Sequence, residues 1–492
     1  MSGNTDDGPI PAGIPTRKSD RSLAACYRAP GSYNEGIVKI ALISTYELGR
    51  QPFGLASPAA WLGKRGHRVT CMDLSREPLN ERALREAGLI AFYVPMHTAT
   101  RLTVELLEPL RLLNPSAHFC AYGLYASLSA EILRAHGIGS LLGGEFEQAL
   151  VDLAEHLAGL SALPQIHPLD SNVSLARLRF LVPDRSGLPP LRSYAHLVLP
   201  SGEHRTVGYT EASRGCKHHC RHCPIVPVYE GAFRVVDREV VLADIRQQVS
   251  AGAQHITFGD PDFFNGVGHA IPLVEAVHRE FPRLTYDVTI KVEHLLQNPE
   301  LLSTLRTTGC LFIVSAVESL DDGVLLKLQK NHTRADFFRA VKLCRRSGIT
   351  LQPTFVPFTP WTTLEQILDL FEQLHRLELV EAVSPIQLAI RLLIPAGSLL
   401  MELDEVRRIV GAFDPRGLVY PWKNPNPAVD ELCEELQDIV AASEKPRRSR
   451  AAAFDKMWSA VNQASQRRGD DRVQRPQPSH AAVPYLNEPW YC

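Results

Sequence analysis

The feature that most constrains the fold is an alternation of strand-like and helix-like segments, which occurs in two separate parts of the chain. Residues 38–158 contain five short apolar segments that are typical of buried strands, with helical segments after them. The stretch 201–400 shows about six further strand–helix units, from Val207–Ala212 to Pro385–Leu393. Strands that alternate with helices form parallel sheets. We therefore predict an α/β chain, with a doubly wound Rossmann-like sheet followed by a partial (β/α)6 barrel.

The composition of the remaining segments predicts two flexible tails, a linker and a helical C-terminal region. Residues 1–37 and 467–492 are mostly polar, and we predict flexible tails there. Six prolines punctuate residues 159–200, which predicts a linker between the two α/β parts. Residues 401–466 contain three segments with helical character, so a helical C-terminal region is expected.

The bulk composition excludes several functional classes. The chain has 492 residues, a formal net charge of −2 and no general excess of basic residues, so nucleic-acid binding is not expected. It contains no apolar run long enough to cross a membrane, and the N-terminus lacks the apolar core of a signal peptide. The ten cysteines do not suggest a disulfide framework. These properties predict a cytoplasmic protein.

Three cysteines fall within eight residues directly after the first strand of the predicted barrel. Cys216, Cys220 and Cys223 have the spacing C-x3-C-x2-C and follow the turn Ser213–Gly215. Three thiolates on one loop can converge on a metal centre. A [4Fe–4S] cluster normally takes four cysteines, so three would leave one iron open for another ligand.

A structural zinc site is the alternative for this loop. His218, His219 and His222 are interleaved with the cysteines, so a Cys3His ligand set is possible. Zinc sites usually use two separated pairs of ligands, and no second C-x-x-C pair follows in this chain. The spacing therefore favours the cluster, and we expect the three histidines to be solvated side chains on an exposed loop.

The form Ser-Arg-Gly-Cys, followed by this cysteine spacing, resembles the signature of the radical S-adenosylmethionine (radical SAM) superfamily. The resemblance implies that Cys216, Cys220 and Cys223 hold a [4Fe–4S] cluster whose open iron binds the amino and carboxylate groups of SAM. It also implies that one electron, from a reductant such as flavodoxin or ferredoxin, cleaves SAM to a 5′-deoxyadenosyl radical. That radical would activate a C–H bond of a small-molecule or peptide substrate, which the sequence does not identify.

Acidic residues follow later strands of the predicted barrel, where the resemblance implies SAM contacts. Asp260 and Asp262 take the place of the family motif that holds the SAM amino group. Glu318 and Ser319 end the fourth strand, and a carboxylate there suits the ribose hydroxyls. The alternative for these residues is a turn or helix-capping role. Because barrel chemistry gathers at the carboxyl ends of strands, the functional interpretation is favoured.

The N-terminal α/β part resembles the cobalamin-binding domain of the B12-dependent branch of the superfamily. Gly143, Gly144 and Glu145 match the Gly-Glu-x-Glu turn that opens the last helix of such domains, so the resemblance implies that they contact cobalamin. The Asp-x-His-x-x-Gly motif expected after the first strand is absent, and Thr45–Arg50 stands in its place. Cobalamin would then bind without a protein histidine below the cobalt. The alternative is a Rossmann-like domain that binds nothing.

The C-terminal sequence adds a further resemblance. Residues 484–492 end in Trp-Tyr-Cys, which resembles radical SAM proteins whose tails end in Cys-Cys-Ala-Glu-Pro or Cys-selenocysteine-Ala-Glu-Pro. From this we expect that Cys492 is not the natural end of the protein. The alternative is a disordered tail that happens to finish in cysteine.

Two other functions stay open at this point. A methylthio- or sulfur-inserting radical SAM enzyme acting on RNA would usually need further cluster cysteines upstream, and only Cys26, Cys71 and Cys120 lie there. A non-enzymatic zinc-binding protein is the other alternative. The first hypothesis is a radical SAM enzyme, perhaps with methyl transfer from methylcobalamin.

Overall fold

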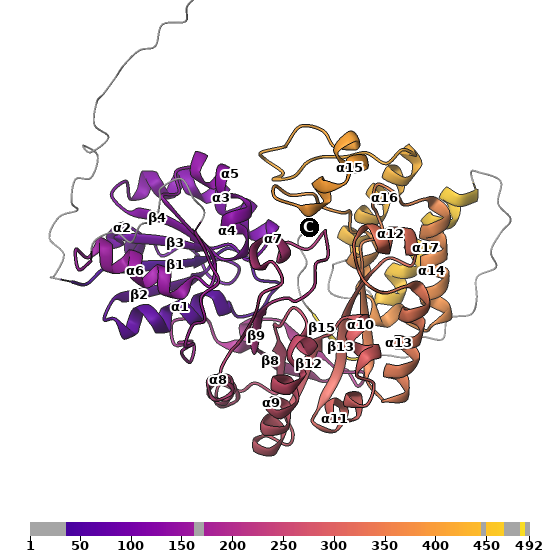
Figure 1. Ribbon diagram of the computed structural model, residues 1–492, viewed down its shortest axis with the longest axis horizontal. Coiled ribbons are helices and arrows are strands. Elements are labelled where there is room, and N and C mark those ends of the chain that lie inside the picture. The colour runs from indigo at the N-terminus through magenta and orange to yellow at the C-terminus, as the bar shows by residue number, and fades with distance from the viewer. Residues whose placement is uncertain (1–35, 162–171, 444–448, 467–482, 488–492) are drawn as a thin grey trace, which may run out of the picture.

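The computed structural model describes residues 36–161, 172–443, 449–466 and 483–487. Two α/β units lie side by side, the N-terminal one at the left of Figure 1 and the second at its centre and right. Residues of the predicted tails that lie outside these ranges include Cys26 and Cys492. In the part of the chain that the structure describes, no helix has the length and apolar character needed to span a membrane.

The N-terminal unit is a parallel sheet with helices on both faces, as predicted. Its strand order is β2-β1-β3-β4-β5-β6, so the order reverses between β1 and β3, where ligands of such sheets bind. Buried apolar clusters on the two faces fix the helices. The strands are β1 (Lys39–Ser44), β2 (Arg68–Asp73), β3 (Leu89–Tyr93), β4 (His118–Tyr122), β5 (Ser140–Gly144) and β6 (Asn172–Ser174). The helices are α1 (Phe53–Lys64), α2 (Glu81–Glu86), α3 (His97–Leu113), α4 (Leu124–Leu128), α5 (Ala130–Ala135) and α6 (Glu147–Leu157).

The second unit is a curled half-barrel, and the predicted fold class is confirmed. The strand order is β14-β13-β12-β11-β8-β7-β15, with the first five strands of this order parallel and the last two antiparallel. The strands are β7 (His196–Val198), β8 (His204–Thr210), β11 (His255–Phe258), β12 (Thr285–Thr289), β13 (Cys310–Glu318), β14 (Thr350–Phe355) and β15 (Tyr485–Leu486). The helices are α8 (Arg238–Ser250), α9 (Val267–Glu280), α10 (Val292–Gln297), α11 (Leu301–Thr307), α12 (Asp322–Lys327), α13 (Arg334–Arg346) and α14 (Leu364–Arg376).

The sixth strand predicted for the barrel does not form. Pro385–Leu388 is a 3-10 turn, and the segment touches the sheet through one isolated bridge between Phe358 and Arg391. The side-chain oxygen of Gln387 accepts a hydrogen bond from the backbone N–H of Phe355 at 3.2 Å. A side chain thus takes the place of a sixth backbone ladder at the edge of β14.

The segment predicted as a linker, 159–200, is more ordered than its prolines suggested. It supplies β6 to the first sheet and β7 to the second. Between these strands, Arg185 forms a buried ion pair with Asp244 at 2.7 Å and donates to Gln51 at 2.7 Å. Because Gln51 belongs to the N-terminal unit and Asp244 to α8, this segment ties the two units together.

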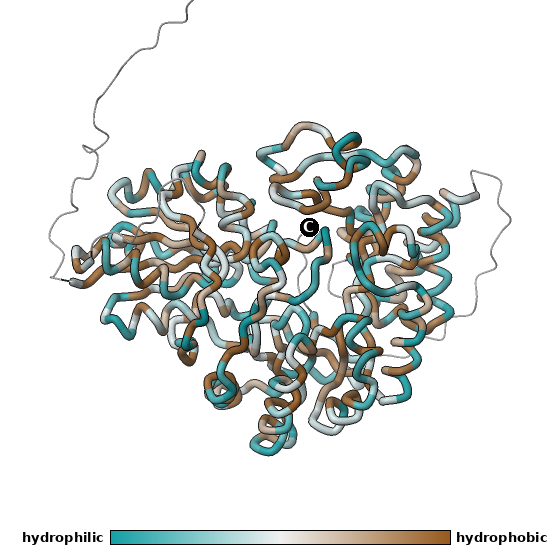
Figure 2. Tube along the Cα trace, viewed as in Figure 1, coloured by the Kyte–Doolittle hydropathy of each residue, from teal (hydrophilic) through white to brown (hydrophobic). Residues whose placement is uncertain are grey.

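The three C-terminal helices are α15 (Asp404–Ile409), α16 (Pro427–Ser443) and α17 (Arg450–Gln466). Of these, α16 and α17 pack beside α14 on the outside of the half-barrel (Figure 1), while α15 belongs to a separate apolar cluster with Leu400 and Trp422. The ring of Phe454 stacks on that of Phe371 from α14, with centroids 5.1 Å apart, and Trp458 lies against both. Figure 2 shows hydrophobic stretches along the N-terminal sheet and a mixture of hydrophobic and hydrophilic residues on the surrounding helices.

Candidate active site

The three clustered cysteines lie on one loop that follows β8. They are free thiols; Cys220 is buried, while Cys216 and Cys223 are partly exposed. Both ends of the loop are fixed, by an antiparallel strand pair and by a short helix. These elements are β9 (Ser213–Gly215), β10 (Phe233–Val235) and α7 (Val226–Tyr229). Gly215 has a φ of +72°, and a Cβ there would lie 2.3 Å from a backbone oxygen, so the turn requires glycine.

The surroundings of the thiols suit a metal centre that displaces their protons. Burial raises the pKa of Cys216 and raises that of Cys223 to about 12, and the neighbouring thiols add to both effects. The Lys330 ammonium opposes the shift at Cys223. A bound metal deprotonates such thiols outright, and a set of thiolates is the donor set of iron–sulfur centres.

The arrangement of the thiols bears on the zinc alternative. Among the described residues, the set of three ligating groups with donor atoms within 4.8 Å of one another is His218, Asp262 and His294, and it contains no cysteine. Ligands of a single zinc ion must converge on one point. The cysteines of a [4Fe–4S] cluster each bind a different iron, so the observed spacing favours the cluster.

Asp260, predicted as a cofactor contact, instead holds the start of the cysteine loop. Its carboxylate accepts hydrogen bonds from the Ala212 N–H at 3.0 Å and from the Ser213 hydroxyl. Burial raises the pKa of Asp260 to about 7, although both hydrogen bonds act against this shift. Its role in this arrangement is to position the loop.

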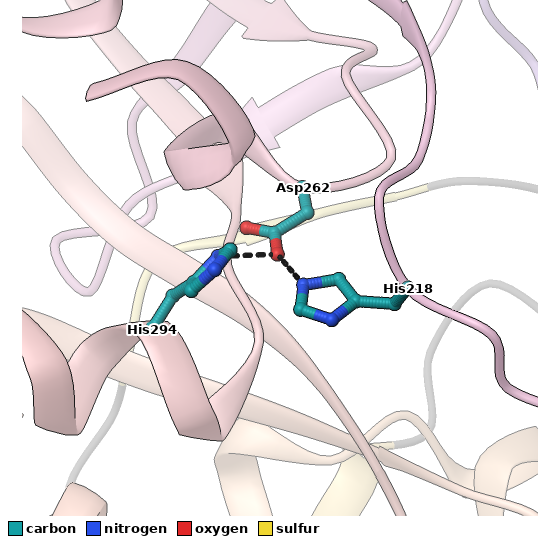
Figure 3. A group of neighbouring side chains, drawn as sticks. All are labelled: His218, Asp262 and His294. Carbon is teal, nitrogen blue, oxygen red and sulfur yellow. Dashed lines mark hydrogen bonds and ion pairs between the residues drawn. The ribbon is translucent and has the colours of Figure 1, made fainter. Parts of the chain in front are cut away.

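Asp262 lies under the same loop and faces two histidines. One carboxylate oxygen, Oδ2, lies 3.0 Å from Nε2 of His218 and 2.7 Å from Nδ1 of His294 (Figure 3). The other oxygen accepts a hydrogen bond from the Phe264 N–H at 3.2 Å. Burial alone would raise the pKa of Asp262, but the two imidazoles outweigh it and hold that pKa below its usual value.

Glu318 forms a second contact between the loop and a strand end. It ends β13 with a φ of +68°, an uncommon conformation for a residue with a side chain. Its carboxylate pairs with His222 at 3.1 Å and with Lys330 at 3.2 Å. Burial opposes ionisation, but Lys330 and His222 hold the pKa of Glu318 well below its usual value. The neighbouring Ser319 accepts a hydrogen bond from the Asp321 N–H at 3.1 Å.

The expectation that the loop histidines are solvated is wrong for two of the three. The side chains of His218 and His222 are only 10% and 15% exposed, and each contacts a strand-end carboxylate. His219 is exposed, as predicted. The two buried histidines lie on either side of Cys220, so the centre of the loop is fixed from both sides.

A cavity of about 340 Å³ opens inside the half-barrel below the loop. Strand residues Thr257, Asp287 and Gln352 line it, and two arginines from outside the barrel complete it. These are Arg50, from the N-terminal unit, and Arg450, at the start of α17. Sequence reasoning missed both arginines, because each lies far along the chain from the strands of the half-barrel.

The predicted cobalamin residues lie where the two units meet. Gly144 has a φ of +67° and packs so closely on β6 that a Cβ would lie 2.3 Å from the Ser174 oxygen. The neighbouring Gly143 also packs against β6, where a Cβ would lie 3.1 Å from Val173. Glu145 is fully buried and pairs with Arg214, just before the cysteine loop, at 3.1 Å. These three residues therefore make packing and interdomain contacts.

A cavity of about 140 Å³ lies between the N-terminal unit and the cysteine loop of the second unit. Tyr93, Gly123 and Phe146 of the N-terminal unit line it together with residues of the cysteine loop. The rings of Tyr93, Tyr122 and Phe146 pack together there, with centroids 4.9–6.0 Å apart. This cavity is smaller than the pockets of about 300–1,000 Å³ that hold drug-sized ligands, so a corrinoid does not fit the edge as it stands.

Comparison with known proteins agrees with this geometry. The model of the radical SAM superfamily matches residues 210–379. The hopanoid C-3 methylase of Methylococcus capsulatus is 26% identical over 325 residues, which are 63% of this chain and 62% of the methylase. The chain thus aligns with less than two thirds of the length of this relative.

Two solved structures share the fold over most of this chain. One is the radical SAM methyltransferase TsrM from Kitasatospora setae with tryptophan and a SAM analogue bound, which has a TM-score of 0.60 at 17% identity. The aligned part is 75% of this chain and 76% of the TsrM chain. The other is the cobalamin-dependent SAM radical enzyme OxsB without ligand, which has a TM-score of 0.67 at 16% identity. The aligned part is 88% of this chain and 72% of the OxsB chain. At these identities the likeness establishes the fold. The family match begins at the end of β8, just before the cysteine loop, and runs through the strands whose ends face that loop, so residues 210–379 form a radical SAM domain within a chain that has the fold of these two solved structures.

Proposed function

We propose that the protein is an enzyme that cleaves SAM and activates a substrate C–H bond. The observation that carries this proposal is a loop with three free thiols, fixed over the carboxyl ends of the barrel strands and facing two strand-end carboxylates. A [4Fe–4S] cluster on Cys216, Cys220 and Cys223 would supply the electron that cleaves SAM. A reductant such as flavodoxin or ferredoxin has to deliver that electron.

The residues around the loop then have separate roles. Asp260 positions the start of the loop through its hydrogen bonds to Ala212 and Ser213. Glu318 and Ser319, at the end of β13, stay the proposed contacts for the SAM ribose, and Asp262 the proposed contact for its amino group. Burial of these side chains at the strand ends supports the assignment, because an excluded-water site strengthens polar contacts to a charged ligand.

We infer that the substrate binds in the 340 Å³ cavity inside the half-barrel. Its volume suits a small molecule or the side chain of a peptide. The lining combines arginine guanidinium groups with hydroxyl and amide side chains, which are donors for a polar substrate. The carboxyl ends of the strands place this cavity next to the cysteine loop, as radical transfer to a substrate requires.

Methyl transfer with cobalamin is the more specific proposal. It is supported by the names of the relatives, a hopanoid methylase, a methyltransferase and a cobalamin-dependent enzyme. Gly143, Gly144 and Glu145 stay the predicted contacts of the corrinoid. The cavity at this edge is only about 140 Å³, so a corrinoid would need more room there than the side chains leave.

The remaining alternatives have less support. Of the upstream cysteines, Cys71 and Cys120 lie buried in the N-terminal unit, at 9% and 0% exposure, where they cannot hold a second cluster for sulfur insertion. Cys26 lies outside the described residues. A zinc protein would need a convergent ligand set at the cysteine loop.

Anaerobic reconstitution tests the proposed activity. The wild-type chain is expected to bind about four iron and four sulfide per molecule and, with a strong reductant, to convert SAM to 5′-deoxyadenosine. The measurements are iron and sulfide analysis, electron paramagnetic resonance and chromatography of the nucleoside product. A chain that takes up one zinc and no iron under these conditions would contradict the proposal.

A corrinoid titration of the full chain tests the cobalamin proposal. Cobalamin is expected to bind base-off without histidine ligation, because the loop 45–50 that follows β1 contains no histidine. The absorption spectrum of the bound corrinoid distinguishes this state from free, base-on cobalamin. If the spectrum does not change at high micromolar corrinoid, the N-terminal unit is a structural domain, while the SAM-cleavage proposal stands.

A further inference from the structure

A second group of possible metal ligands lies beside the cysteine loop. His218 comes from the loop, Asp262 from the segment after β11 and His294 from α10, and Figure 3 shows their side chains pointing toward one another. The donor atoms all lie within 4.8 Å of one another. Three elements that are distant in the sequence thus bring two imidazoles and one carboxylate to one point.

The chemistry of this set matches a common transition-metal site. Two histidines and one carboxylate bind zinc or iron(II) and leave further coordination positions open. The Asp262 side chain has no exposure, and those of His218 and His294 have 10% and 15%. A buried carboxylate needs a positive partner, and a divalent ion in the middle of the three side chains provides one.

The two histidines share one oxygen of the carboxylate. Both imidazoles face the same carboxylate oxygen, although the second oxygen of Asp262 accepts only a backbone N–H. Nδ1 of His294 lies 2.7 Å from that oxygen and Nε2 of His218 lies 3.0 Å from it, so both rings converge on a single oxygen. A metal ion between the three groups would accept a lone pair from each of them, which is the convergence that a shared metal site requires.

The outer surroundings support the same interpretation. Glu293 lies 3.7 Å from Nδ1 of His218, the ring nitrogen that does not face Asp262. Histidine ligands usually direct their second nitrogen to a carboxylate, which orients the ring. His218 also lines a cavity of about 690 Å³, so ions and small ligands can reach it from solvent.

We propose that His218, Asp262 and His294 bind one divalent transition-metal ion with the ligand preference of zinc or iron(II), in addition to the cluster. The ion would anchor the loop between Cys216 and Cys220 to β11 and α10. The proposal does not depend on SAM cleavage. In this proposal the Asp262 carboxylate is a metal ligand. The SAM amino group would then either reach Asp262 at the metal site or compete with the ion for the carboxylate.

Cobalt(II) titration of the full chain with Cys216, Cys220 and Cys223 all changed to serine tests the site without the cluster. We expect one equivalent of Co(II), with d–d bands and no thiolate charge-transfer band. Adding His294→Ala or Asp262→Asn is expected to weaken binding by at least about 100-fold, because even outer-shell changes cost 10–100-fold. His219→Ala is the matched control, since His219 is exposed on the same loop, and it should leave binding unchanged.

A second measurement keeps the test decisive if the serine variant does not fold. Zinc and iron are then quantified in reconstituted wild-type, His294→Ala and His219→Ala chains, and the expected result is one metal ion beyond the cluster that only His294→Ala lacks. Equal metal content or equal Co(II) affinity in the His294→Ala and His219→Ala chains would overturn the proposal. Retention or loss of SAM cleavage bears only on the proposed activity, so failure of one proposal is distinguishable from failure of the other.

Discussion

Changing Cys216, Cys220 and Cys223 together to alanine is expected to abolish both cluster binding and SAM cleavage. Iron should fall from about four per chain to background, because each cysteine supplies the ligand of a different iron. 5′-Deoxyadenosine formation should fall below detection, since no other described group at this loop can deliver an electron to SAM. The measurements are iron analysis, visible absorbance and product chromatography after the same anaerobic reconstitution.

The control for this variant is a cysteine that lies in the core. Cys344 has no exposure and lies in the helix α13, so Cys344→Ala removes a thiol without touching the loop. This control should keep the full iron content, with some loss of stability from the small cavity. A triple variant that keeps about four iron atoms would show that the cluster is bound elsewhere.

The sequence predicted those parts of the site that depend on local spacing. The cysteines stand together on a loop as expected, and Asp262 and Glu318 follow β11 and β13. The partners of these carboxylates could not be predicted, because His218 lies 44 residues from Asp262 and His222 lies 96 residues from Glu318. Such contacts depend on the curvature of the sheet, which no local pattern encodes.

Two segments differ from their predicted local structure for a common physical reason. The segment 385–393 is a short apolar run, and such runs are compatible with strands, turns and buried helices. Packing against the half-barrel fixes its conformation, and the Gln387 side chain accepts a hydrogen bond from the backbone of β14. The prolines of 159–200 indicated a linker, but three residues between them were enough to add β6 to a sheet. Tertiary contacts outweighed local composition in both cases.

Arg214 is a contact between the units that no motif indicated beyond the Ser-Arg-Gly turn. Its guanidinium donates to Glu147 at 2.7 Å, to Glu211 at 2.7 Å and to Glu145 at 3.1 Å, and it is only 8% exposed. Phe53, Phe146 and Phe180 surround it, with ring centroids 5.0–5.7 Å from the guanidinium carbon. One cation therefore contacts three carboxyl groups in an apolar environment, where an unpaired charge is costly.

Changing Arg214 to methionine is expected to lower the free energy of unfolding by about 3–5 kcal/mol, the usual cost of removing one partner from a buried ion pair. Methionine keeps much of the volume between the phenylalanine rings, so lost packing contributes less than the uncompensated carboxylates. The measurement is urea unfolding of the chain before reconstitution, so that cluster loss does not contribute. Arg246→Met is the control, because the Arg246–Glu280 pair is 44% and 36% exposed and screened by water.

The pH dependence separates an electrostatic effect from a packing effect. Without Arg214, Glu145, Glu147 and Glu211 remain buried, and burial raises a carboxyl pKa. The folded state would then hold protons that the unfolded chain releases above the usual carboxyl pKa. The loss of stability should therefore grow as the pH rises from 5 to 8 and shrink as it falls. Adding Glu147→Gln to Arg214→Met should restore part of the stability at pH 8. A loss that is the same at both pH values would show that Arg214 acts through packing alone.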